Sequence, residues 1–230
     1  MSFTIGVLEG GAVAPQFAAH LTSFTDSFQR FLAPGGKGPT LRTYQCYAGE
    51  FPSSGDACDG WLITGSAASV YDGDAWIARL EAFTRTASQT RPLVGICFGH
   101  QLVAQAFGGT VEKAAGWGVG VHGHDITGPG APLRRLELLA SHQDQVMTPP
   151  PGAQVLGGSD FCPIGVMSIG ANVLSIQNHP EMTKVFATDL YAFRREVIGA
   201  DVADAALASL TQPTNEADVR RWILDFLDRS

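Results

Sequence analysis

The sequence of 230 residues predicts an α/β fold, in which a doubly wound, mostly parallel sheet is flanked by helices and carries a small antiparallel edge. Three observations predict it. Short apolar segments alternate with amphipathic segments through the first half, as in consecutive βα units. The second half changes to short strand-like segments separated by turn residues. The chain then closes with two helical segments.

The first half contains the alternating elements. Strands are expected at residues 3–8, 40–46, 60–63 and 93–96, and helices at residues 16–32, 74–87 and 100–107. Gly108 and Gly109 supply the end of the third helix. The first helix has apolar residues near the 3.6-residue period, which we expect to face the core: Phe17, Leu21, Phe24, Phe28 and Phe31.

The second half predicts the antiparallel edge and the closing helices. Short strands are expected at residues 110–112, 119–126, 136–140, 154–156, 162–169 and 173–177, and helices at residues 183–198 and 216–228. Neither an internal repeat nor a linker is visible, and the proline run at 149–151 is too short to separate domains. The sequence therefore predicts a single domain over residues 1–230.

Composition and charge exclude several classes of function. Fifteen basic and 22 acidic residues give a formal charge of −7, which argues against nucleic acid and anionic membranes as partners. No apolar run approaches the roughly 18 residues that span a bilayer. Residues 1–8 lack the basic start of a signal peptide. The four cysteines form no C-x-x-C pair, which argues against zinc and disulfides and indicates a reducing, cytoplasmic setting.

Cys97 lies in a candidate nucleophile elbow. Residues 92–96 form a short apolar strand, and Gly95-Ile96-Cys97-Phe98-Gly99 has the G-x-S-x-G spacing with sulfur in place of oxygen. The two glycines leave room for a sharp strand-to-helix turn. The positive end of the helix dipole favours the thiolate form of a cysteine in this position. The alternative is a buried core cysteine beside a tight turn.

Asn178-His179-Pro180-Glu181 follows the last expected core strand. Pro180 favours extended backbone at His179, and residues two apart in extended chain point the same way. His179 and Glu181 can therefore act as a base and the carboxylate that orients it. The alternative is a solvated surface loop. Because the carboxyl ends of parallel strands lie together, we expect both side chains beside Cys97.

A third strand end, Thr64-Gly65-Ser66, is a candidate for stabilising a developing oxyanion. Glycine-rich turns leave backbone N–H groups unobstructed. The N–H of Gly65 together with that of Phe98 could supply two donors. Taken alone, a Gly-Ser pair after a strand is usually only a turn.

These segments carry a resemblance to a known family. The chain resembles the class I (triad-type) glutamine amidotransferases from residue 3 to about residue 183, through Gly-Ile-Cys-Phe-Gly-His-Gln at 95–101, Ser-His-Gln-Asp-Gln-Val at 141–146 and Asn-His-Pro-Glu at 178–181. The resemblance implies a flavodoxin-like sheet. It also implies that Cys97 attacks the γ-amide of glutamine, that His179 is base and acid, and that Glu181 orients it.

The same resemblance implies the residues that bind substrate. Gln101 matches a glutamine that contacts it, and residues 116–118 with Trp117 match a stretch that lines the pocket. The segment that holds the α-amino and α-carboxyl groups corresponds to Ser141, His142 and Asp144. The oxyanion loop departs from the family's usual Gly-Gly-Pro or Gly-Gly-Ser at Thr64.

The resemblance implies a cysteine-dependent hydrolase of γ-glutamyl amide bonds in glutamine or in γ-glutamyl amines and peptides. His100 and the His-Gln-Asp-Gln segment are most similar to standalone members, which resemble the glutaminase domain of guanylate synthetase and include γ-glutamyl peptidases. The chemistry needs no metal or organic cofactor. One alternative is a glutaminase subunit that delivers ammonia to a separately encoded synthetase, and another is a non-catalytic binding protein of the same fold.

One further pattern could bind a metal. His122, His124 and Asp125 could meet an ion from one face of a strand, but no matching ligands accompany them elsewhere. We therefore interpret them as a solvated strand face.

Overall fold

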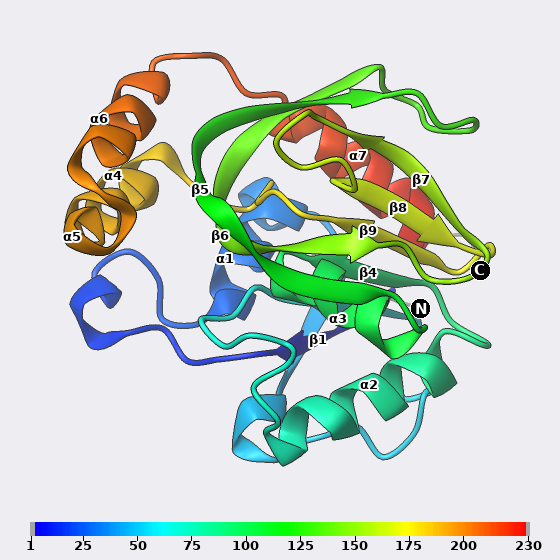
Figure 1. The fold of residues 1–230 in the computed structure, drawn as a ribbon. Helices are drawn as coiled ribbons and strands as arrows, with labels where there is room; N and C mark the ends of the chain where they lie inside the picture. Colours follow the sequence, from blue (N-terminus) through cyan, green and yellow to red (C-terminus); the bar gives the residue numbers. More distant parts are fainter. Residues whose placement is uncertain (1–2, 229–230) are drawn as a thin grey trace.

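A computed structural model describes residues 3–228, and within this range one nine-stranded sheet forms the centre of the molecule (Figure 1). The strands follow the order β2-β1-β3-β4-β9-β8-β7-β5-β6. Neighbours from β2 to β9 run parallel, and those from β9 to β6 run antiparallel. The predicted α/β class with an antiparallel edge is confirmed.

The parallel half matches the sequence-based expectation closely. Its strands are β1 (Thr4–Glu9), β2 (Thr40–Gln45), β3 (Gly60–Ile63), β4 (Leu93–Ile96) and β9 (Val173–Ile176). The connecting helices are α1 (Phe24–Leu32), α2 (Ala75–Ala87) and α3 (Phe98–Ala106). Short apolar runs between turn residues therefore predicted the strands almost to the residue.

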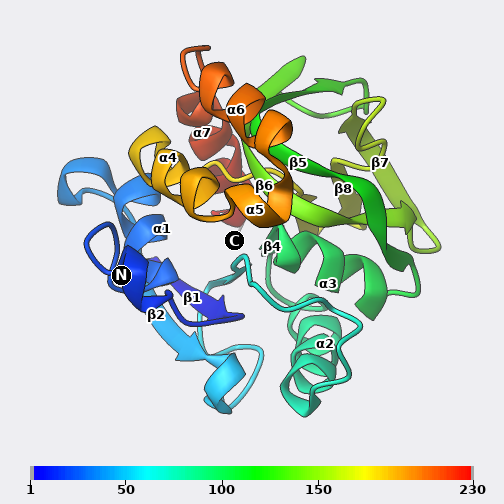
Figure 2. The ribbon, with the colours of Figure 1, turned by 60° about the vertical axis from the view of Figure 1, so that its left-hand side comes forward.

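Helices cover both faces of the parallel half. On one face, α1 and α7 (Glu216–Leu227) bury Phe28 and Trp222 against Val7. On the other, α2 and α3 bury Leu80 and Leu102. Figure 2 shows the two pairs on opposite sides of the sheet. Each helix presents an apolar stripe, and this burial is what stabilises the layered arrangement.

The antiparallel part is larger than predicted. Its strands are β5 (Thr110–Ile126), β6 (Arg135–Thr148), β7 (Ala153–Gly158) and β8 (Val166–Ile169). The separate strands expected at 110–112 and 119–126 are one strand with a register shift between Lys113 and Gly118. The glycines around Trp117 suggested a loop, but irregular pairing accommodates them inside a strand.

The long helix predicted at residues 16–32 is wrong in its first half. Residues Pro15–Phe17 form a 3-10 turn, and α1 begins only at Phe24. Ser23 begins α1 as its N-cap, because its Oγ accepts a hydrogen bond from the Asp26 N–H at 3.1 Å. Further 3-10 turns span Pro34–Gly36 and Cys46–Ala48.

The C-terminal helices also differ from expectation. The segment predicted as one helix at 183–198 divides into α4 (Lys184–Phe193) and α5 (Arg195–Ile198), and α6 (Ala200–Ser209) follows. Gly199, with φ of 96°, makes the bend before α6, a helix that the sequence analysis missed. These three helices lie at the left of Figure 1, beside the loop that follows β1, and Phe17 packs there against Phe186.

Candidate active site

Cys97 occupies a strained turn between β4 and α3. Its φ and ψ are 53° and −104°, and it is the one non-glycine residue with positive φ among residues 3–228. Such conformations cost of order 1–3 kcal/mol and persist where the surrounding structure enforces them. The Cys97 N–H donates to the Ile176 carbonyl at 2.9 Å, which ties the turn to β9. The geometry is that of a nucleophile elbow.

The two glycines of the elbow are needed for space. A Cβ on Gly95 would collide with the backbone carbonyl of Gly99, and a Cβ on Gly99 would lie 2.5 Å from the Ile63 carbonyl oxygen. The close approach lets the Gly99 N–H donate to the Thr64 carbonyl at 3.2 Å. The ends of β3 and β4 are thereby held together, as the sequence predicted.

His179 and Glu181 form a buried pair beyond the end of β9. His179 Nδ1 lies 2.8 Å from Glu181 Oε1, and the two side chains are 10% and 6% exposed. The His179 N–H donates to the Leu139 carbonyl at 2.8 Å, and Ser27 Oγ donates to the Glu181 carbonyl at 3.1 Å. Backbone and side-chain bonds from β6 and α1 thus hold both residues, so the solvated-loop alternative is wrong.

The electrostatics of His179 favour its charged form. Burial alone would lower its pKa, but the Cys97 thiolate and the Glu181 carboxylate, which both bond to the ring, raise that pKa well above the ordinary value. Because Glu181 occupies Nδ1, Nε2 is the ring nitrogen available to sulfur. The second carboxylate oxygen of Glu181 is buried without a hydrogen-bond partner among residues 3–228.

Gly65 lies at the same place from the end of β3. A Cβ added to it would lie 2.9 Å from His179 Cε1 and 3.8 Å from Cys97 Cβ. The Phe98 N–H is at the first position of α3, where backbone donors have no partner within the helix. Both residues expected to supply oxyanion donors are therefore next to Cys97.

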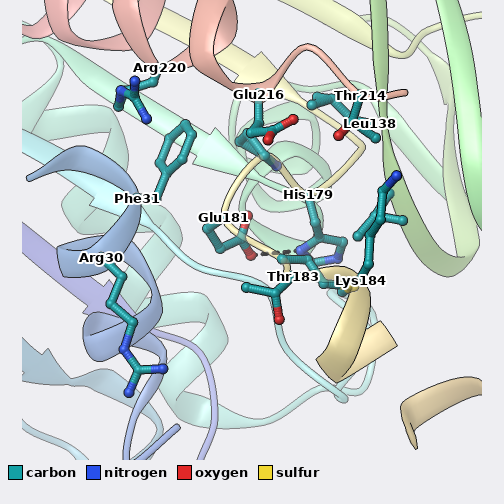
Figure 3. A pocket seen from close by; sticks show the side chains of 13 residues that line it. Arg30, Phe31, Leu138, His179, Glu181, Thr183, Lys184, Thr214, Glu216 and Arg220 are labelled. Carbon is teal, nitrogen blue, oxygen red and sulfur yellow. Dashed lines mark hydrogen bonds and ion pairs between the residues drawn. The ribbon is translucent and has the colours of Figure 1, made fainter. Parts of the chain in front are cut away.

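Two cavities flank these residues. One of about 320 Å³ touches His179 and Glu181 from behind and is lined by charged side chains, including Arg30 and Glu216 (Figure 3). The other, of about 460 Å³, is reached by Cys97 itself. We call the second the thiol cavity.

All five side chains expected to bind substrate line the thiol cavity: Gln101, Trp117, Ser141, His142 and Asp144. Gln101 is buried and donates through Nε2 to the Asp144 carbonyl at 2.8 Å. Asp144 accepts from Ser69 Oγ at 2.5 Å and from Tyr71 Oη at 2.8 Å. The structure thus brings together the residues that the sequence grouped.

His142 is buried at the cavity wall and stays neutral. Burial lowers its pKa to about 3, and Nδ1 lies 3.1 Å from the Asp144 carbonyl oxygen. A neutral ring hydrogen-bonded through Nδ1 shapes the pocket without adding charge.

The sequence analysis missed several residues of the thiol cavity. Ser69 and Tyr71 come from the loop after β3, whereas Phe193, Arg194 and Val197 come from α4, α5 and their junction. The segments Ser-Ala-Ala-Ser at 66–69 and Phe-Arg-Arg at 193–195 are ordinary surface sequences. Only the tertiary structure places them in the same cavity as Cys97.

His100 and His124 are buried outside the thiol cavity. His100 is fully buried between Ser175 Oγ at 2.8 Å and the Ile164 carbonyl at 2.9 Å, and burial lowers its pKa to about 4. His124 is also fully buried, which corrects the interpretation of its strand face as solvated. Within residues 3–228 no group of three or more candidate side chains could hold a metal ion.

The other three cysteines are free and buried. Burial raises the pKa of Cys46 and Cys162 to about 12 and also raises that of Cys58. Of the four thiols, Cys97 alone lines the thiol cavity.

Comparisons with known proteins identify the family. The family model for glutamine amidotransferase class-I matches residues 23–195. This chain belongs to the class I glutamine amidotransferases. Family membership makes it an enzyme of hydrolase type and removes the non-catalytic alternative.

Individual relatives and a solved structure agree with this family assignment. This amidotransferase is 30% identical to γ-glutamyl peptidase 5 of Arabidopsis thaliana over 82% of this chain and 80% of the relative. It is 35% identical to a glutamine-hydrolysing GMP synthase of Thermus thermophilus, over 53% of this chain but only 24% of that protein. A solved glutamine amidotransferase of Thermotoga maritima shares the fold, with a TM-score of 0.76 over 100% of this chain and 98% of that one at 14% identity. No helix among residues 3–228 is long and apolar enough to cross a membrane.

Proposed function

We propose that this amidotransferase hydrolyses γ-glutamyl amide bonds through a thioester at Cys97. The observation that carries the proposal is the convergence of a strained cysteine, a buried His179–Glu181 pair and the backbone of Gly65 and Phe98 around the Cys97 side chain. Relatives named γ-glutamyl peptidase and glutamine-hydrolysing GMP synthase support the same bond as the target.

The reaction begins with attack of the Cys97 thiolate on the γ-carbonyl carbon. The carbonyl electrons move to oxygen, and the N–H groups of Gly65 and Phe98 stabilise that oxyanion. The C–N bond breaks as the His179 imidazolium gives its proton to the leaving nitrogen, which leaves a γ-glutamyl thioester and a free amine. His179 then takes a proton from water, the resulting hydroxide attacks the thioester, and the C–S bond breaks to release glutamate.

Glu181 is the orienting residue in this scheme. It fixes the His179 ring through Nδ1 and stabilises the imidazolium that each cycle requires. Gln101, Trp117, Ser141, His142 and Asp144 form the substrate-binding wall, with Asp144 as the partner for the α-ammonium group. The scheme uses no metal and no organic cofactor. We expect the enzyme in the cytoplasm, because its four cysteines are all free thiols.

A second candidate is a glutaminase subunit that passes ammonia to a separately encoded synthetase. The sequence similarity to a glutamine-hydrolysing GMP synthase, which covers 24% of that protein, favours this candidate. An autonomous peptidase is favoured by the relatives aligned over about four fifths of their length. Activity of the isolated chain separates the two.

The test is glutamate release from purified protein, with glutamine and a panel of γ-glutamyl amides and dipeptides. We expect kcat of about 1 s⁻¹ or more on at least one γ-glutamyl amide or dipeptide of the panel, and no turnover by Cys97→Ser. Cys162→Ser is the matched control, because this thiol is buried away from the thiol cavity. If the wild-type protein becomes active only when a synthetase is added, the glutaminase-subunit function is the one that remains. If Cys97→Ser is active, the proposed thioester mechanism is refuted.

A further inference from the structure

Arg194 is a half-buried cation that pairs with no carboxylate among residues 3–228. It lies at the junction of α4 and α5 and lines the thiol cavity. Among residues 3–228 its side chain makes one hydrogen bond, from Nη1 to Ser141 Oγ at a long 3.4 Å. Burial lowers the pKa of Arg194, and the Cys97 thiolate opposes that shift, so guanidinium and sulfur share one environment. Neighbouring Arg195, in contrast, bonds to both carboxylate oxygens of Asp204.

The charges around the thiol cavity do not balance for glutamine. Besides the Cys97 thiolate, whose charge the His179 imidazolium offsets, the cavity wall carries one carboxylate, Asp144, whose hydrogen-bond partners are neutral hydroxyl groups, and two cations, Arg194 and Lys113. His142 adds no charge. Bound glutamine has one ammonium and one carboxylate group. A γ-glutamyl amino acid has a second carboxylate, on the leaving residue, and so complements the wall.

The spacing places this second carboxylate at Arg194. Asp144 and Ser141, the residue that Arg194 contacts, are three apart on β6, and three strand residues span roughly 10 Å. In an extended γ-glutamyl amino acid, about seven bonds, or roughly 9 Å, separate the α-ammonium from the carboxylate of the leaving residue. The glutamyl α-carboxylate lies only about 3 Å from the same ammonium. An ammonium at Asp144 therefore puts the leaving carboxylate near Arg194.

Apolar side chains line the same cavity as the guanidinium. Phe193 and Val197 line the thiol cavity, yet they are 63% and 70% exposed. Trp117 contributes a half-buried ring to the same wall. Exposed apolar groups at a cavity mouth are suited to cover an apolar part of a ligand. In this cavity that part is the side chain of the leaving residue.

We propose that Arg194 determines specificity by binding the carboxylate of the leaving group, so that the preferred substrates are γ-glutamyl amino acids or peptides with an apolar leaving residue. The inference rests on the proposed hydrolase function and adds the class of amine released. The guanidinium donates to the carboxylate, and Phe193 and Val197 cover the adjoining side chain. Arg194 acts on binding and takes no part in proton transfer.

The test compares three substrates: γ-glutamylphenylalanine, γ-glutamylphenethylamide, which lacks only the leaving carboxylate, and glutamine. A charge-assisted hydrogen bond contributes about 1.5–3 kcal/mol, so we expect the dipeptide to have about ten- to a hundredfold higher kcat/KM than the phenethylamide. Arg194→Gln should remove most of this ratio, chiefly through KM, and Arg194→Lys should restore part of it. Arg195→Gln, which alters the paired neighbour outside the cavity, should leave it unchanged.

The outcomes separate the possible failures. A wild-type kcat/KM for the dipeptide close to that for the phenethylamide would overturn the inference. An equal loss of kcat/KM on all three substrates in Arg194→Gln would also overturn it, because that result places the glutamyl α-carboxylate, which all three share, at Arg194. The phenethylamide rate of each variant also reports whether that variant is folded. If the wild-type protein releases no glutamate from any substrate, the proposed function itself fails. Equal wild-type kcat/KM for γ-glutamylglycine and γ-glutamylphenylalanine would contradict the apolar preference.

Discussion

Replacing Glu181 by Gln tests how strongly one buried carboxylate supports catalysis. The substitution keeps the shape of the side chain and removes its charge 2.8 Å from His179 Nδ1, where the two side chains are 6% and 10% exposed. A charge-assisted hydrogen bond of this kind contributes about 1.5–3 kcal/mol, and its loss should lower the pKa of His179. The same energy predicts about a ten- to a hundredfold loss of kcat/KM.

The assay for Glu181→Gln is the pH profile of glutamate release on the best substrate. We expect the lower rate together with a displacement of the profile, because His179 loses its proton at lower pH. His179→Ala should lose more, about a thousandfold or beyond, since it removes the proton-transfer group itself. Glu216→Gln is the matched control, because this carboxylate lines the cavity behind the pair without bonding to His179. Wild-type rates and an unshifted profile in Glu181→Gln would reduce the triad to a Cys97–His179 dyad.

Three further predictions follow from burial and packing. Iodoacetamide near neutral pH should label Cys97 first, and peptide mapping that finds any of the other three buried cysteines labelled faster would contradict the assignment. Gly65→Ala should lose activity while its circular dichroism and Tm stay near wild type, because the added methyl group would lie 2.9 Å from His179 Cε1; full activity would remove Gly65 from the site. The pKa of His100 is lowered to about 4 in the fold, so the unfolded chain binds more protons below pH 6.5 and stability falls as pH drops. From pH 7 to 5 this histidine should account for about 2 kcal/mol of lost unfolding free energy, and urea titrations in which His100→Gln shows the same loss would refute it.

Local patterns predicted the parallel half of the fold because all of its strands except the polar β2 are short apolar runs between turn residues. Residues 60–63 and 93–96 were predicted with the observed bounds. The helix at 16–32 failed for a local reason, since the 3.6-residue period of its apolar residues extends past the Ser23 cap. Phe17 is indeed buried, but against α4 and not as part of a continuous helix.

Pairing in the antiparallel half depends on partners far along the chain. Residues 141–146 lay outside the strands expected from the sequence, yet they belong to β6 and pair with β5 across a register shift. Glycine and polar residues weaken a strand signal when it is judged from one strand alone. The ladder with β5 supplies the hydrogen bonds that the local sequence does not predict.

The sequence by itself determined the elbow at Cys97, the shared direction of His179 and Glu181 and the carboxyl-edge position of both segments. These follow from short-range sterics: glycines that admit a tight turn, a proline that restricts its neighbour, and the shared direction of parallel strands. Only the tertiary structure decided the thiol cavity. Arg194 reaches it because Gly199 turns the chain and α4 to α6 pack against β5 and the loop after β1, a set of contacts between segments distant in sequence that no local pattern encodes.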